Sequence, residues 1–231
     1  MKKILFVLSF TLIVAPLVAQ VTISGNAVAS VQFSDVNGRL IPANGNGVKG
    51  SPYVFEKFGM GKVYMADGVE AIDSNLNFSY FDQKLYFLKD NNMYVVNKPF
   101  KMFLLNQVLD NTSVEKYFAN GFPAIEQNTL ATFYEVIAKG LTVQLLKFRK
   151  AVIKESTPYG SAPVKEYSND DRYYIFDANS KQMQALGGSV TLKKLKTVLP
   201  HYASQLDALN TQLRLNLKRE ADAKLLIEKL N

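Results

Sequence analysis

One pattern recurs along the chain: a strand rich in aromatic and β-branched residues, a short turn carrying aspartate, and a returning apolar strand. It occurs at residues 61–72, 76–96 and 172–186, with turns at 67–68, 82–83, 90–92 and 177–180. Asp, Asn and Gly in such turns favour a tight reversal between two antiparallel strands. The phrases KVYMADG, KLYFLKDN and YYIFDAN are too loosely related to count as a sequence repeat. The pattern therefore predicts antiparallel hairpins as the building unit of the fold.

The middle of the chain contains a further hairpin, a segment that fits either a strand or a helix, and a polar segment. Residues 131–153 alternate on both sides of a turn at 139–140, which places Leu145, Lys147 and Arg149 on one strand face. Residues 100–110 fit a buried strand or a short helix, because periodicity alone does not separate the two. Residues 154–172 are polar and contain two prolines, so they are predicted to form a loop.

After residue 186 the apolar residues change to helical spacing. Ser189 is the expected N-cap of a first helix, and Pro200 separates it from a second. A third helix is expected at roughly 218–230, where Ala223, Leu226, Ile227 and Leu230 fall on one face. The fold class expected from the whole chain is α+β, mainly β: an antiparallel sheet of seven to ten strands in meandering hairpins, forming a curved sheet or open barrel. The sheet domain spans 53–186, and the helices of 187–231 pack on it.

The first 19 residues have the composition of a secretory signal peptide. Two lysines precede a largely apolar stretch of 12 residues, Ile4 to Ala15, and Ala19 is a small residue suited to cleavage. The alternative, a helix that stays in the membrane, requires about 20 apolar residues. We expect cleavage after Ala19 and a protein located in the periplasm, on the outer membrane or outside the cell. No span is expected in the mature chain, which begins with a strand segment at 20–41.

Residues 42–52, PANGNGVKGSP, hold three glycines at the spacing of a dinucleotide-binding fingerprint. That site requires a preceding strand and a following helix whose N-terminus holds the pyrophosphate. Pro42 ends any strand before the glycines, and Pro52 moves Ser51 out of helical geometry. The segment is therefore predicted to be a loop between the N-terminal strand segment and the sheet domain, with no cofactor.

Composition excludes several kinds of chemistry. The chain has no cysteine, so it has no disulfide, thiolate metal site or cysteine nucleophile. His201 is the single histidine, and the nearby Ser204 and Asp207 cannot form a catalytic relay around it from one helix. The Asp and Asn of 35–38 and 177–180 are explained by turn formation without calcium. Removal of the signal peptide with its two lysines lowers the net charge from +7 to +5, below what a nucleic-acid-binding protein usually has, so no nucleic-acid partner is expected. No metal is expected either, because one histidine and no complete calcium loop are present.

Four residues are weak candidates for ligand or surface contact: Lys147, Arg149, Tyr134 and Phe148. The segment LLKFRK at 145–150 joins apolar and basic residues in an arrangement suited to lipid. The alternative is a strand leaving the core, whose charged end protects a sheet edge. The basic helix TLKKLKTVL at 191–199 allows a similar pair of interpretations, contact with an anionic membrane or packing against the sheet.

Carboxylates can hydrolyse glycosides as a pair across a cleft. The acids here, among them Glu126, Glu135, Glu155 and Glu166, are scattered, and no spacing pairs them. The absence of tryptophan also removes the ring that stacks best on a sugar.

Three stretches carry a resemblance: GSPYVFEKFGMGKVYMADG, FSYFDQKLYFLKDNNMYVV and LKREADAKLLIEKLN. Over residues 47–231 the chain resembles exported proteins of Bacteroidota of unknown function, which implies a compartment and no site. Our first hypothesis is an exported, non-enzymatic envelope protein that binds or scaffolds. Its partner is unknown, with envelope lipid, polysaccharide or another envelope protein as candidates. The alternatives are a carrier of an apolar ligand such as lipid, favoured by the two apolar faces of FYEVIAKGLTVQLL, and a carbohydrate-active hydrolase.

Overall fold

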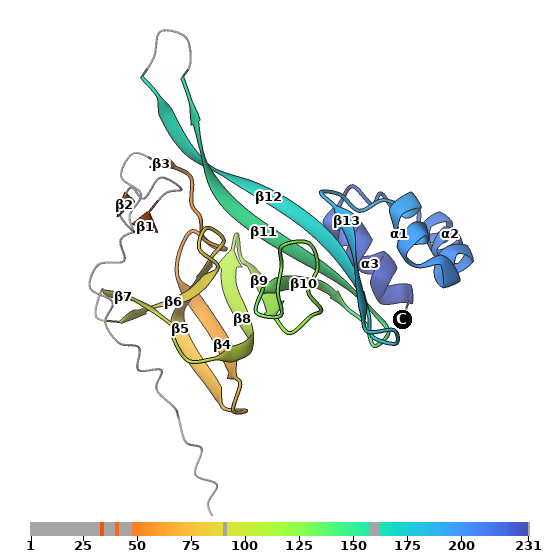
Figure 1. Cartoon of the computed structure of the whole chain (residues 1–231), viewed down its shortest axis with the longest axis horizontal. Coiled ribbons are helices and arrows are strands. Elements are labelled where there is room, and N and C mark those ends of the chain that lie inside the picture. Colours follow the sequence, from red (N-terminus) through yellow and green to blue (C-terminus); the bar gives the residue numbers. More distant parts are fainter. Residues whose placement is uncertain (1–32, 35–39, 42–47, 90–91, 158–161, 231) are drawn as a thin grey trace, which may run out of the picture.

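The computed structural model describes residues 33–34, 40–41, 48–89, 92–157 and 162–230 (Figure 1). The predicted signal peptide, most of the segment 20–41 and two of the three fingerprint glycines lie outside these residues. The third, Gly50, has a φ of +81°, as expected for a loop glycine. Within the predicted loop 42–52, Val48–Lys49 forms the short strand β3.

The described residues form thirteen strands and three α-helices. The strands are β1 (Phe33–Ser34), β2 (Leu40–Ile41), β3 (Val48–Lys49), β4 (Gly59–Met65), β5 (Glu70–Ser79), β6 (Lys84–Lys89), β7 (Asn92–Val95), β8 (Phe100–Leu109), β9 (Thr112–Ala119), β10 (Tyr134–Lys139), β11 (Val143–Ser156), β12 (Val164–Asp177) and β13 (Gln182–Gly187). The helices are α1 (Leu192–Val198), the 3₁₀ turn η1 (Pro200–Tyr202), α2 (Ala203–Leu213) and α3 (Glu220–Leu230).

Most strands belong to one large sheet with the order β13-β12-β11-β10-β9-β8-β4-β5-β6-β7. Neighbours on this path are antiparallel, and β3 joins β12 in parallel. The predicted fold class is therefore confirmed, and the turns at 67–68, 82–83 and 177–180 join antiparallel strands as predicted. Residues 90–91 of the fourth predicted turn lie outside the described residues. The sheet has eleven strands, slightly more than the seven to ten expected, and 100–110 forms a strand, β8.

The sheet curls until the β5–β6 turn reaches β11. The amide of Ala151 donates to the carbonyl of Tyr80 at 3.0 Å, and Gln83 Nε2 donates to the carbonyl of Arg149 at 3.0 Å. β5 and β11 form no ladder, so the result is an open barrel. The right-handed twist of neighbouring strands gives a long sheet this tendency to coil.

The inner face of the curl is filled by aromatic side chains. Phe78, Phe103 and Phe118 are almost fully buried, and the rings of Phe103 and Phe118 stack with centroids 4.7 Å apart. Phe100 and Phe133 pack against the same group. Alternate residues of β5, β8 and β9 point to this side, so strand periodicity brings the rings together.

The three helices cover the other end of the inner face, over β10, β11 and β13 (Figure 1). Leu195 of α1, Leu206 of α2 and Leu226 of α3 are fully buried and pack with Leu145 and Ile175 of the sheet. Of the two interpretations of the basic helix, α1 thus fits packing against the sheet. Its N-cap is Thr191, not Ser189, because the Thr191 hydroxyl accepts from the amide of Lys194 at 3.3 Å.

The predicted loop at 154–172 is wrong. β11 continues to Ser156 and β12 begins at Val164, so the two strands form a hairpin that extends beyond the rest of the sheet (Figure 1). Opposite charges face each other across it, Lys154 with Glu166 and Glu155 with Lys165. A hairpin exposed on both faces needs no apolar alternation, and such cross-strand pairs support it. The missing alternation led to the loop prediction.

Candidate functional site

The four candidate contact residues lie on opposite faces of the sheet. Lys147 and Arg149 of β11 point to the inner face. Tyr134 of β10 is fully buried on the outer face, where its ring lies beside those of Phe148 and Tyr174. The four residues therefore form two separate pairs. Lys147 and Arg149 lie on the inner face, and Tyr134 and Phe148 belong to an apolar cluster of the outer face.

Lys147 lies at the centre of a group of charges between the two apolar clusters of the inner face. Its ammonium is 3.0 Å from a carboxylate oxygen of Glu135 and 2.8 Å from Oε2 of Glu220, although its side chain is only 3% exposed. Lys116 of β9 contacts the other oxygen of Glu135 at 2.6 Å. We call Lys116, Glu135, Lys147 and Glu220 the ion-pair row.

Two further interactions connect the region of the ion-pair row to β12. Tyr173 donates its hydroxyl to Oε2 of Glu220 at 2.8 Å. Arg149 forms a two-pronged ion pair with Asp171, with both nitrogen–oxygen distances at 2.6 Å. Two parallel bonds of this kind fix geometry as well as adding energy.

Strand register explains how these residues meet. Glu135 lies directly opposite Lys147, which in turn lies opposite Tyr173, and Arg149 lies opposite Asp171. Directly opposed residues of antiparallel strands have side chains on the same face and within reach. Glu220 arrives from the first turn of α3, so the ion-pair row also joins the helical segment to the sheet.

The carboxylates of this region are held in their charged form. Burial would raise the pKa of Glu135, but Lys147 and Lys116 outweigh it and hold the pKa below its ordinary value of 4.5. Burial would also raise the pKa of Asp171, but the hydrogen bonds from Arg149 outweigh it and hold the pKa below its ordinary value of 3.8. Burial and the bond to Glu220 raise the pKa of the Tyr173 hydroxyl. These groups thus form a fixed network of charges near neutral pH.

This network predicts a loss of stability in acid. The folded-state pKa of Glu135 lies below its unfolded value, so the unfolded chain binds the proton more tightly. The stabilisation is complete above about pH 5 and decreases as the pH falls through the folded pKa. Carbon-detected NMR of the Glu135 carboxyl should give a titration midpoint below 4.5, and a midpoint above 4.5 would contradict the geometry.

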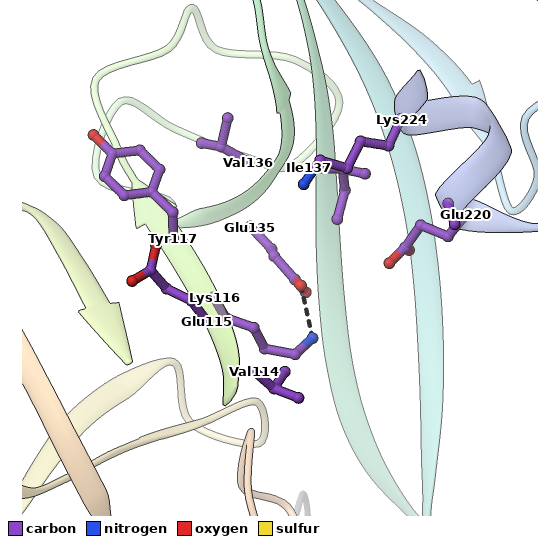
Figure 2. A pocket seen from close by; sticks show the side chains of 10 residues that line it. Val114, Glu115, Lys116, Tyr117, Glu135, Val136, Ile137, Glu220 and Lys224 are labelled. Carbon is purple, nitrogen blue, oxygen red and sulfur yellow. Dashed lines mark hydrogen bonds and ion pairs between the residues drawn. The ribbon is translucent and has the colours of Figure 1, made fainter. Parts of the chain in front are cut away.

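A hollow of about 320 Å³ opens beside the ion-pair row, between β9, β10 and the start of α3 (Figure 2). Its wall is formed by residues 114–117, 135–137, 220–221 and 224. Figure 2 shows Tyr117 and Lys116 on one side and Ile137, Glu220 and Lys224 on the other. The volume is at the lower end of the range of ligand sites, about 300–1,000 Å³.

Three glutamates line the hollow, Glu115, Glu135 and Glu220, and a glycoside hydrolase requires a pair of carboxyl groups. Glu135 and Glu220 both contact the ammonium of Lys147, however, and the pKa of Glu135 is lowered. A hydrolase needs one carboxyl protonated near neutral pH, with a raised pKa, to donate to the leaving group. Glu135 therefore cannot be that acid. The scattered acids Glu126, Glu155 and Glu166 lie outside the wall of the hollow.

A second, more open hollow of about 530 Å³ lies over α1, η1 and the start of α2. Lys193 and Lys196 contribute to its wall, and Lys196 pairs with Asp207 at 2.6 Å. Lysines contribute to both walls, so neither hollow is lined by apolar side chains alone. The exposed His201 lies next to this region and outside its wall.

Other chemistry finds little support in the described part of the chain. These residues contain no cluster of three or more His, Asp or Glu able to hold a metal ion. Asp177 accepts from the amides of Asn179 and Ser180, which agrees with its predicted role in a turn. None of the described helices is long and apolar enough to cross a membrane.

Comparison of the chain with protein-family models, with curated proteins and with solved structures finds no match. The class of protein is thus defined by its own geometry: an open, curled β-sheet with a small helical cap and a buried ion-pair row beside a hollow.

The sequence prediction included only part of this site. Lys116, Asp171, Tyr173 and Glu220 were missed. Opposite charges at 149 and 171 would have suggested pairing if 154–172 had been interpreted as a continuing hairpin. Glu220 lies 73 residues from Lys147, and no local signal connects the two.

Proposed function

We propose that the protein is an exported, non-enzymatic binding protein of the cell envelope, and that it binds at the hollow between β9, β10 and α3. The observation that carries the proposal is the position of this hollow. It lies where α3 meets the consecutive strands β9 and β10, and its walls combine apolar side chains with lysines and glutamates. Sites with a few polar groups in a preformed hollow are the usual form of a binding site.

Export is supported by the N-terminal sequence, in which two lysines and an apolar stretch end near Ala19. The absence of cysteine fits a chain that folds outside the cytoplasm without disulfides, because the aromatic core supplies the stabilisation. N-terminal sequencing of the protein recovered from the envelope should begin at Gln20. Recovery with Met1 intact would contradict export by cleavage.

Binding is favoured over catalysis because the four charged groups of the ion-pair row satisfy one another. Both oxygens of Glu135 contact lysines, so the carboxylate is not available as a base or nucleophile. A carrier of lipid would need an empty apolar cavity inside the sheet. Phenylalanine rings fill the inside of the curled sheet instead. The remaining possibility is a surface that holds a partner in place.

A photo-reactive residue placed in the hollow tests this proposal. Benzoylphenylalanine at position 221 replaces an exposed alanine of the wall, and the same residue at 229 occupies an exposed position of α3 outside the wall. After irradiation of cells that export the protein, we expect a discrete adduct from position 221 and none from 229. Adducts of equal yield from both positions, or none from 221, would contradict binding at the hollow.

A further inference from the structure

The ladder between β9 and β10 is broken. Only two residue pairs join the strands, Tyr134 with Ala119 and Glu135 with Phe118. Continuation of this register would set Val136 opposite Tyr117 and the next residue opposite Lys116. The described strands do not pair there, although both continue, β9 back to Thr112 and β10 on to Lys139. The hollow occupies this place, because 115–117 and 135–137 are consecutive wall residues on the two strands.

A second irregularity lies at the same point on the other side of β10. The register with β11 shifts between Val136 and Ala138, which identifies a bulge at Ile137. Bulges bend a strand and end its pairing with a neighbour. The bulge therefore turns β10 away from β9, and β9 remains paired to β8 along its whole length.

Two strand edges thus face each other inside the sheet without a ladder between them. In an antiparallel strand, alternate residues direct their amide and carbonyl to one side, so part of the backbone of 114–117 and 136–138 points into the gap. Unpaired edges of this kind accept an added strand. We propose that the hollow is an acceptor site for an extended peptide segment of a partner protein, which inserts between β9 and β10. This inference rests on the proposed binding function and specifies its partner class.

The side chains around the gap define the chemistry of the segment. On the inner side, Val114 and Ile137 provide apolar surface beside Lys116 and Lys224. The ammonium of Lys224 lies 3.8 Å from the carboxylate of Glu228, and both side chains are exposed. An exposed pair of this kind contributes little to stability, so Lys224 is available to a ligand. Oε1 of Glu135 is occupied by Lys116, and Oε2 of Glu220 by Lys147 and Tyr173. An acidic side chain flanked by two apolar ones fits this inner side.

The matching probe is a fluorescent pentapeptide, Val-Thr-Glu-Thr-Val, with blocked termini. Its alternate side chains place both valines and the glutamate on one side. Its length of about 16 Å at 3.3 Å per residue covers the four wall residues of β9, which span about 13 Å. Fluorescence anisotropy with the full mature chain should show saturable binding at or below about 1 mM. The absence of saturable binding up to that concentration would overturn the proposal.

Controls separate strand insertion from other contacts. Two peptides N-methylated at alternate positions keep the side chains and lose the amide donors on one side or the other. At least one should bind at least tenfold more weakly, and equal affinity of all three peptides would overturn the proposal. A peptide with lysine in place of its glutamate should also bind at least tenfold more weakly, and equal or tighter binding would contradict the acidic segment.

A matched pair of variants places the binding at the gap. Ala221→Trp adds a large side chain to the wall from an exposed helix position, whereas Lys229→Trp changes an exposed position of the same helix away from it. We expect at least a tenfold loss of affinity for the first variant and none for the second. Equal affinities would overturn the proposal. If position 221 cross-links in cells and the pentapeptide fails to bind, the binding function stands and the peptide class is wrong.

Discussion

Replacing Lys147 with methionine is expected to lower the free energy of unfolding by about 3–5 kcal/mol, the usual cost of removing one partner from a buried ion pair. The ammonium of Lys147 contacts Glu135 and Glu220, and its side chain is 3% exposed. Methionine preserves most of the volume but leaves the buried carboxylate of Glu135 with Lys116 alone. The loss should also loosen α3, since Glu220 is bound to the sheet through Lys147 and Tyr173. Urea unfolding at pH 7 measures the change.

An exposed ion pair serves as the control for Lys147→Met. Lys62 lies 3.0 Å from Glu70, and both side chains are more than 40% exposed. The variant Lys62→Met should leave the urea midpoint almost unchanged, because an exposed pair contributes little to stability. A loss for Lys147→Met no larger than that for Lys62→Met would show that the buried row contributes no more than a surface pair, contrary to the geometry.

Truncation of Phe103 to alanine is the second change with a large expected effect, a loss of about 3–5 kcal/mol. The Phe103 ring is fully buried and stacks on Phe118, with Phe78 and Phe133 at 5.1 and 5.3 Å between centroids. Its removal leaves a cavity that these rigid rings cannot fill without moving the strands. The same urea measurement reports the loss.

Val108 on the same strand provides the matched control for Phe103→Ala. It is 67% exposed, so Val108→Ala should change the free energy of unfolding by no more than about 0.5 kcal/mol. Similar losses for the two variants would mean that the aromatic cluster is not the core of the curled sheet.

Much of the fold could be predicted because its signals are local. The turn at Asp67-Gly68 and the alternation around it define β4 and β5 without reference to the rest of the chain. The buried face of α3 was predicted from the spacing of Leu226, Ile227 and Leu230, all buried in the structure. Periods of two and 3.6 residues are properties of single elements, so a single sequence reveals them.

The extended hairpin and the N-cap show where such local signals are ambiguous. Residues 164–172 carry polar side chains on both faces, some exposed and some, such as Asp171, in ion pairs. A polar strand without apolar alternation looks like a loop. Ser189 and Thr191 are both suitable caps, and only the position of α1 against the sheet distinguishes them.

The candidate site depends on information that no local pattern contains. Lys147 and Arg149 were predicted as candidates for ligand or surface contact, but their ion-pair partners come from β10, β12 and α3. The broken ladder depends on the bulge at Ile137, and nothing in the segment YEVIAK marks that residue. Register and bulges are set by the whole sheet, so they became visible only in the structure.

The central claim is that the sheet is open between β9 and β10, and amide hydrogen exchange of the free protein tests it most directly. We expect every second amide in 114–117, those directed toward the gap, to exchange at least a hundredfold faster than the amides directed toward β8. The amides of 144–147 in the β11 ladder serve as a protected reference. Slow exchange at all four positions of 114–117, equal to this reference, would show that the ladder is closed and would contradict the account.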